Sequence, residues 1–130
     1  MKKWTERKLK EAGYEIKNAL ITKVDLSTQD HAAACFEIVL DGSGWGVCYG
    51  GYKLATAGTY LKQEEIEASE KGFEAILNIM WVLESDSLIA LKGKYVRVAT
   101  KGWGDSVNII GNITKERWFD YGTFFEGEKE

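Results

Sequence analysis

One glycine-rich segment combines the residue types that could hold a ligand against bare backbone. Residues 41–58 read DGSGWGVCYGGYKLATAG and contain six of the 14 glycines, together with one tryptophan and two tyrosines. Because glycine lacks a Cβ atom, a ligand can approach its backbone closely, and aromatic rings can stack on that ligand. The pattern therefore favours one of two structures, a ligand surface or a strand bent by its glycines.

The segment matches neither of the common phosphate-binding motifs. A P-loop requires lysine after its second glycine, and counting from Gly46 that place is held by Tyr52. A dinucleotide fingerprint requires a glycine where Tyr49 stands, with a helix directly after it. The ligand hypothesis therefore depends on the rings of Trp45, Tyr49 and Tyr52.

A second tryptophan between glycines occurs in KGWGD, residues 101–105. An exposed Trp103 would be an anchor for a base or a partner side chain, with positive charge from Arg97 and Lys101 beside it. The alternatives are that Trp103 packs over one end of the domain and that Arg97 lies solvated on an outer face. The predicted ligand-binding residues are Trp45, Gly46, Tyr49, Gly50, Tyr52, Arg97, Lys101 and Trp103.

The sequence offers little for catalysis. His31 is the only histidine, and a Cys48–His31 dyad is a weaker interpretation than a turn formed by Asp30 and His31. Cys35 and Cys48 have neither zinc-site spacing nor a CxxC pattern, so we expect reduced, buried thiols in a cytoplasmic protein. We expect no enzymatic activity, no cofactor and no metal site.

The charge of the chain lowers the expectation of nucleic-acid binding. The formal net charge is −3, whereas a nucleic-acid binder normally carries a basic surface that neutralises phosphates. No apolar run approaches the roughly 20 residues of a membrane helix, and no signal peptide follows Met1. We therefore expect no membrane partner.

The chain is predicted to be one domain, with an N-terminal helical segment (1–15), a core (16–125) and an acidic tail (126–130). Alternating patterns predict strands at 16–29, 32–41 and 45–55, with a turn near residues 29–31, and two further strands within 93–103 and 106–114. In the first strand the apolar residues Ile16, Leu20, Val24 and Leu26 lie on or near one face. In the second strand one face is predicted to hold Ala32, Ala34, Phe36, Ile38 and Leu40, and the other Ala33, Cys35, Glu37 and Val39.

A helix is predicted between the third and fourth strands. Ser69 is a suitable N-cap, and Glu84, Ser85 and Asp86 mark the end. The residues at helical spacing are Phe73, Ile76, Leu77, Met80 and Leu83, and the stripe is widened by Ile79, Trp81 and Val82. Because the helix is apolar nearly all round, we expect it to be deeply buried.

The order strand-strand-strand-helix-strand-strand predicts an α+β fold with a mostly antiparallel sheet. More specifically, it is the order of the five-stranded OB-like barrel, in which the helix joins strands three and four. In such a barrel strands two and three form the ligand face, and the loops after strands one and four flank it. This fold would place the glycine-rich segment and the KGWGD turn near one another.

Several short motifs together resemble a family of small uncharacterised proteins encoded by tailed phages and prophages. They are DH after the first strand, LDGSGWGVCYGGYKL, LKGKYVRV, IIGNI and RWFD, and they extend from about Ile16 to Phe125. The resemblance implies expression in a bacterial cytoplasm under phage control. It also implies an accessory role, such as inhibition of host defence, sequestration of signalling nucleotides or assistance to phage DNA metabolism.

Two function classes follow as expectations. The first is a non-enzymatic accessory protein that binds and blocks or sequesters a host factor, for example a defence component. The second is an OB-like module that binds a nucleotide or single-stranded nucleic acid through stacked aromatic rings. The apolar residues of the helix and of the C-terminal WFDYGTFF segment also make a homodimer an open alternative.

Overall fold

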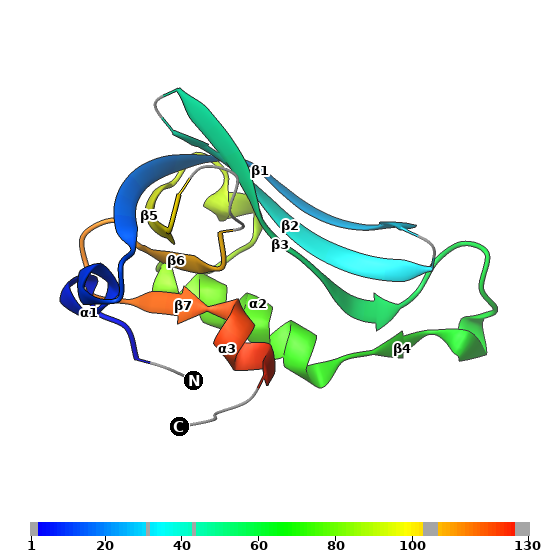
Figure 1. The fold of residues 1–130 in the computed structure, drawn as a ribbon. Helices are drawn as coiled ribbons and strands as arrows, with labels where there is room; N and C mark the ends of the chain where they lie inside the picture. The colour runs from blue at the N-terminus through cyan, green and yellow to red at the C-terminus, as the bar shows by residue number, and fades with distance from the viewer. Residues whose placement is uncertain (1–2, 31, 43, 103–106, 127–130) are drawn as a thin grey trace.

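The computed structural model describes residues 3–30, 32–42, 44–102 and 107–126, with the backbone alone at residues 29, 30, 45, 51 and 52. Seven strands form one sheet, and three α-helices pack around it (Figure 1). The strands are β1 (Glu15–Asp30), β2 (Ala33–Gly42), β3 (Trp45–Thr56), β4 (Glu67–Ala68), β5 (Tyr95–Thr100), β6 (Ile109–Asn112) and β7 (Trp118–Asp120). The helices are α1 (Glu6–Glu11), α2 (Glu70–Val82) and α3 (Tyr121–Glu126), and short 3₁₀ turns occur at Gln63–Glu65 and Ile89–Leu91.

The sheet confirms the predicted α+β class with mostly antiparallel pairing. Its strand order is β4-β3-β2-β1-β5-β6-β7, and every ladder is antiparallel. The predicted number of five strands is wrong, because β4 and β7 extend the sheet at its two edges. Strands of two and three residues are too short to show an alternating pattern, so neither was predicted.

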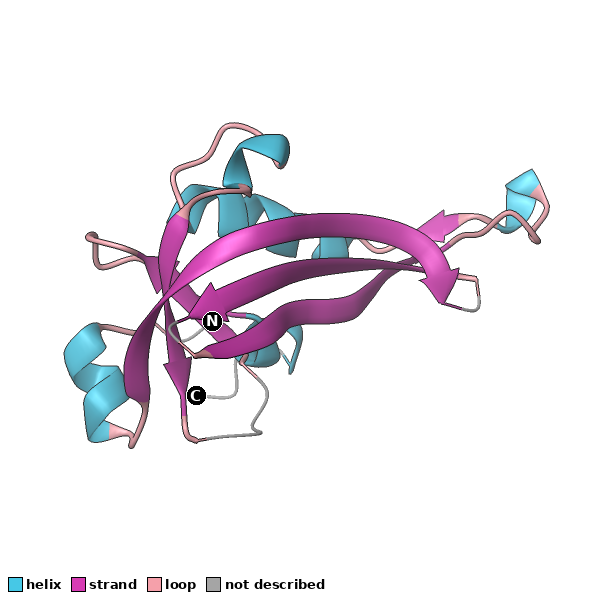
Figure 2. Cartoon of the chain, turned by 90° about the horizontal axis from the view of Figure 1, so that it is seen from above, coloured by secondary structure: helices cyan, strands magenta, loops and turns pink. Residues whose placement is uncertain are grey.

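Strand β1 is long enough to pair with two different neighbours along its length. Residues 15–20 pair with β5, and residues 20–30 pair with β2, with a register shift between Ile21 and Lys23. Seen from above, β1, β2 and β3 run side by side as a long curved layer (Figure 2). The predicted apolar face of β1 is wrong in part: Ala19 and Ile21 are buried, whereas Leu26 is exposed.

The main core lies between this curved sheet and α2. Strand β2 alternates as predicted, with Ala34, Phe36, Ile38 and Leu40 buried. The opposite face of the sheet, near α1, carries a second cluster formed by Leu9, Ala99, Ile109 and Trp118. In β6 and β7 successive residues serve the two faces, because Ile110 and Phe119 belong to the main core and their neighbours Ile109 and Trp118 belong to the second cluster.

Helix α2 begins and ends where the sequence predicts. The Ser69 hydroxyl accepts a hydrogen bond from the Gly72 N–H at 3.0 Å, and Glu84 adopts a positive φ of 52° just beyond the last turn. Gly72 has a packing reason as well, because a Cβ atom there would lie 2.8 Å from the Leu54 Cδ2 atom of β3. The helix therefore contacts the sheet with almost no space between them at its first turn.

The prediction that α2 is buried nearly all round is wrong. The buried residues are Gly72, Ala75, Ile76, Ile79 and Val82, which form one face against the sheet. Phe73, Leu77 and Trp81 lie on the opposite side, with exposed fractions of 62%, 47% and 59%. The sheet covers one face of α2 and α3 also contacts the helix, but the face that carries Phe73, Leu77 and Trp81 is left exposed.

The contrast between the two faces of α2 predicts different costs for neighbouring truncations. Ile79→Ala should lower the free energy of unfolding by about 2–5 kcal/mol, because it opens a cavity against the sheet. Leu77→Ala should lower it by less than about 1 kcal/mol, because the side chain is half exposed. Urea denaturation of both variants and the wild type measures the difference. Equal losses would show that Leu77 is also a core residue.

Candidate functional site

The glycine-rich segment contains the last two residues of β2 and the whole of β3. Phe36 pairs with Tyr52 and Glu37 pairs with Gly50, so Gly51 is an extra residue in a β-bulge. Gly50 has a φ of +99°, and a Cβ atom there would lie 2.7 Å from the Phe36 carbonyl oxygen. At Gly50 the glycine is therefore required by the neighbouring strand, which confirms the interpretation of a bent strand.

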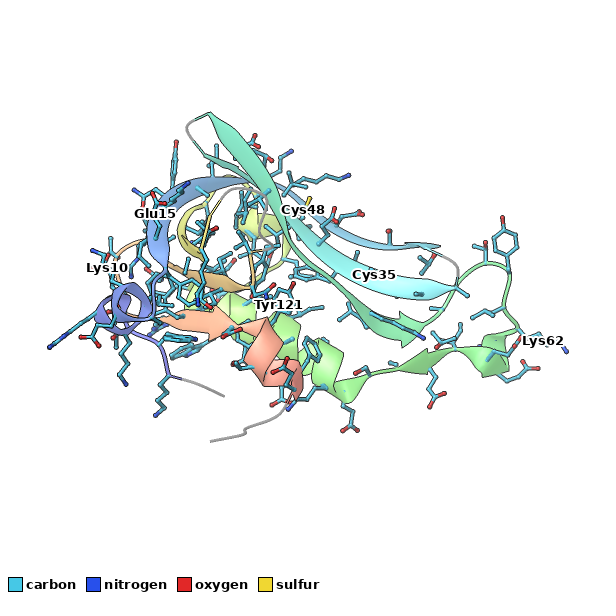
Figure 3. The ribbon with its side chains drawn as sticks, in the orientation of Figure 1. Lys10, Glu15, Cys35, Cys48, Lys62 and Tyr121 are labelled. Carbon is cyan, nitrogen blue, oxygen red and sulfur yellow. The ribbon has the colours of Figure 1, made fainter. Side chains whose placement is uncertain are left out.

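Tyr49 does not present its ring to solvent, so its predicted role as a ligand-stacking residue is wrong. The side chain is fully buried in the main core, and its hydroxyl group donates a hydrogen bond to the Phe119 carbonyl oxygen at 3.4 Å. Its ring meets the ring of Tyr121 edge to face, with centroids 5.1 Å apart. The Tyr121 hydroxyl group in turn donates to the Gly50 carbonyl oxygen at 3.5 Å (Figure 3). Tyr49 therefore joins β3 to β7 and α3.

The remaining aromatic residues of the predicted site fall outside what the structure describes. Trp45 and Tyr52 have described backbone in β3 but no described side chain, and Trp103 lies in the undescribed segment 103–106. Gly46 sits in β3, where a Cβ atom would lie 3.2 Å from a carboxylate oxygen of Asp41. The hypothesis of a stacking surface at these aromatic residues stays a prediction.

Arg97 is a structural residue, so its predicted solvated position on an outer face is wrong, whereas its predicted role beside Trp103 involves a residue outside the described ranges. Its side chain is only 11% exposed, and its guanidinium group donates to the carbonyl oxygens of Asn112 and Lys115 at 2.6 and 2.8 Å. The same group lies 3.6 Å from the Glu6 carboxylate and 3.4 Å from that of Glu116. It joins α1 to the β6–β7 turn. Lys101 instead lies over the ring of Tyr14, 4.7 Å from its centroid.

The cysteines differ from the predicted buried thiols. Cys48 is exposed and Cys35 half-buried, because both lie on the face of the β2–β3 hairpin that points away from the core (Figure 3). Desolvation and the nearby Glu37 carboxylate raise the pKa of the Cys48 thiol, against the opposing effect of Lys23. A raised pKa leaves the thiol protonated at neutral pH, unlike an activated nucleophile. His31, the other member of the dyad considered above, lies outside the described residues.

The structure presents a different candidate site, the exposed face of α2. We call Phe73, Leu77 and Trp81 the outer stripe, because residues four apart lie above one another on a helix surface. The spacing of these three residues in the sequence already places them in one row on the helix. The apolar residues on its other sides prevented the sequence from showing that this row is exposed.

The Trp81 end of the outer stripe is held in place by Arg117. Its guanidinium group lies over the indole ring, 4.2 Å from the centroid, and donates to the Trp81 carbonyl oxygen at 3.1 Å. Next to it, Lys115 forms an ion pair with Glu84 at 2.6 Å, and the Asn112 side chain donates to the Val82 carbonyl oxygen at 2.9 Å. These contacts attach the last turn of α2, and with it the tryptophan end of the stripe, to the β6–β7 turn.

The outer stripe suits binding to another protein. Contiguous exposed apolar side chains on a helix gain free energy when a partner covers them, and tryptophan beside arginine is typical of binding hot spots. Across the described ranges, no three His, Cys, Asp or Glu side chains gather as a metal ion would require. The helices of those ranges are all too short or too polar to cross a lipid bilayer.

The bulge predicts that two glycines with similar backbone angles respond differently to alanine. Gly50 and Gly13 both have a φ above +90°, but only Gly50 has backbone atoms within reach of an added Cβ. Gly50→Ala should therefore lower the free energy of unfolding by at least about 1 kcal/mol more than Gly13→Ala does. Urea denaturation tests this, and equal losses would show that the contact with Phe36 is easily relieved.

The Arg97 network predicts a pH dependence centred on Glu116. Burial raises the pKa of this carboxyl group. This effect is outweighed by hydrogen bonds from the Glu6 N–H, the Trp118 indole and Arg97, and by the positive charge of Arg97, so the pKa lies below the ordinary 4.5. A lowered folded-state pKa stabilises the protein above the ordinary value, and this stabilisation is lost as the pH falls through the folded-state pKa.

Glu116→Gln should therefore be less stable than the wild type at pH 7, and the difference should shrink towards pH 3. Urea denaturation across this range measures it. Glu15→Gln, at an exposed position outside the network, is the comparison variant. A difference between Glu116→Gln and the wild type that stayed constant with pH would contradict the argument.

The comparisons with known proteins do not add a relative. No protein-family model, no curated protein and no solved structure matches the chain.

Proposed function

We propose that this chain is a non-enzymatic binding protein whose partner is another protein and whose binding surface is the outer stripe of α2. The observation that carries the proposal is the exposure of Phe73, Leu77 and Trp81 on one face of a helix whose other face is fixed to the sheet. Burying apolar surface contributes roughly 25 cal/mol per Å². Covering three such side chains therefore supplies several kcal/mol of binding free energy before the cost of association.

The proposed biological role is that of a phage or prophage accessory protein that blocks or sequesters a host factor in the bacterial cytoplasm. The resemblance of the LDGSGWGVCYGGYKL, LKGKYVRV and IIGNI motifs to phage proteins supports this context. A rigid helix face suits inhibition, because a preordered surface loses little conformational entropy on binding. We propose a component of a host defence system as an example of such a factor.

A second candidate is an OB-like module that binds a nucleotide or single-stranded nucleic acid. Three observations support the OB-like topology. Strand β1 pairs with both β2 and β5, and α2 lies in the connection from β3 to β5. In addition, Tyr49 of β3 forms a parallel bridge with Val107, just before β6. The parallel bridge brings β3 towards the other end of the sheet, but the strand order is that of an open sheet and not of a closed barrel.

Two observations rank the nucleic-acid candidate second. Tyr49 is buried and Arg97 is occupied by carbonyl and carboxylate groups, so neither is available to a base or a phosphate. The net charge of −3 also opposes phosphate binding.

The proposed function predicts that a polar change in the outer stripe removes partner binding while the fold is kept. Wild type, Leu77→Ser and Ile89→Ser would be immobilised and exposed to a bacterial lysate, and any retained protein would be identified, purified and titrated. Ile89 is 89% exposed and lies outside α2, in the 3₁₀ turn Ile89–Leu91, so Ile89→Ser is the matched control. We expect Leu77→Ser to weaken the purified complex at least tenfold and Ile89→Ser to leave it unchanged.

Two results would overturn the proposal. One is equal binding of the partner by Leu77→Ser and the wild type. The other is a nucleotide or oligonucleotide as the bound species, retained by all three proteins, which would favour the OB-like module instead. Thermal unfolding of each variant, followed by circular dichroism, verifies that the fold is intact.

A further inference from the structure

We propose that the partner of the outer stripe presents a cationic amphipathic segment, with apolar anchors for the stripe and lysine or arginine side chains beside them. This inference rests on the proposed function, because it names the chemistry of the partner that the same surface would bind. It is carried by a second feature of α2 and the segment before it, which we call the acidic rim. The rim consists of Glu64, Glu65, Glu67, Glu70 and Glu74, and all five are exposed.

On α2 the carboxylates of the rim lie directly beside the anchors of the stripe. Glu70 precedes Phe73 by three residues, and Glu74 precedes Leu77 by three residues, so each pair is adjacent on the helix surface. Within the part of the chain that the structure describes, neither carboxylate forms an ion pair. Both are therefore available to cations of a partner that covers the stripe.

The segment before α2 continues the same combination of apolar and acidic side chains. Ile66 is exposed between Glu65 and Glu67, and Tyr60 is almost completely exposed further up the loop. This loop projects from the body of the protein, with Lys62 at its far end (Figure 3). Lys62 is the one cation among residues 60–70, so the projecting segment is negative overall.

The opposite end of the outer stripe lacks this negative character. There Arg117 lies over Trp81, and Lys115 neutralises Glu84 through their ion pair. The charge thus changes along α2, from acidic beside Phe73 to balanced or positive beside Trp81. A partner helix lying along α2 would place its lysine and arginine residues at the Phe73 end, which gives the complex a defined direction.

The same charges disfavour a parallel pair of this chain as the occupant of the stripe. An antiparallel pair of α2 helices with its twofold axis at Leu77 would place Glu70 of one copy opposite Glu84 of the other, but Lys115 already neutralises that carboxylate, so this pair meets no repulsion there. A parallel pair would place each Glu70 and Glu74 beside its own equivalent. Like charges at an interface oppose the parallel pair. A cationic partner can place a positive charge at both Glu70 and Glu74, so we propose it as the occupant, and an antiparallel dimer is an outcome of the test.

A fluorescence-anisotropy titration with two labelled 18-residue peptides of one amphipathic helical pattern tests the inference. One peptide is built from leucine and lysine, and the other from leucine and glutamate. We expect the wild type to bind the leucine–lysine peptide at least tenfold more tightly at low ionic strength. The preference should fall as NaCl is raised, because salt screens exposed charges.

Variants separate this inference from the proposed function. The double variant Glu70→Gln/Glu74→Gln should bind the leucine–lysine peptide about fivefold more weakly than the wild type at low salt. Its control, Glu11→Gln/Glu15→Gln, has the same net charge but is changed at the α1 end of the molecule, so its affinity should stay within about twofold of the wild type. Leu77→Ser should abolish binding of the peptide.

Each of the remaining outcomes contradicts one specific part of the two proposals. If Leu77→Ser abolishes binding but both double variants behave alike, the surface is correct and the cationic partner is wrong. If Leu77→Ser and Glu70→Gln/Glu74→Gln both bind as the wild type does, the proposed surface is wrong as well. If light scattering shows a dimer that Leu77→Ser dissociates, the occupant of the stripe is a second copy.

Discussion

The structure depends on the ability of one strand to pair on both sides along different parts of its length. Residues 15–20 of β1 form the ladder with β5, and residues 20–30 form the ladder with β2. The two halves of the sheet are therefore parts of one curved surface. Its curvature creates the concave side that α2 fills, and it leaves the other side at β5–β7 for α1 and the cluster around Leu9 and Trp118.

Contacts between distant segments hold this curved arrangement together. The Tyr49 hydroxyl group reaches the Phe119 carbonyl oxygen across 70 residues of sequence, and Arg97 joins α1 to the β6–β7 turn. Buried polar groups of this kind are costly to leave without partners, so each one restricts the positions that its neighbours can take. Two residues that look like ligand contacts in the sequence are thus used to fix the scaffold.

The functional consequence is a helix with two different apolar faces. Small residues such as Gly72 and Ala75 allow α2 to lie close to the sheet, while Phe73, Leu77 and Trp81 remain outside. A helix attached along one face presents the other in a single orientation, as the proposed binding surface requires. The acidic residues around the Phe73 end and the arginine at the Trp81 end are the basis of the charge selectivity that we propose for that surface.

Local patterns in the sequence determined the local structure correctly. The alternation of Ala34, Phe36, Ile38 and Leu40, the Ser69 cap of α2 and the bend at the glycines of β3 all follow from interactions within a few residues or from steric demands of the backbone. The tertiary structure decided which face of α2 is buried, since that depends on which side the sheet covers. It also decided the roles of Tyr49 and Arg97, because their partners lie 15 to 91 residues away in the chain. The candidate site could not be read from the sequence for this reason: exposure is a property of the packed layers, and periodicity alone does not define it.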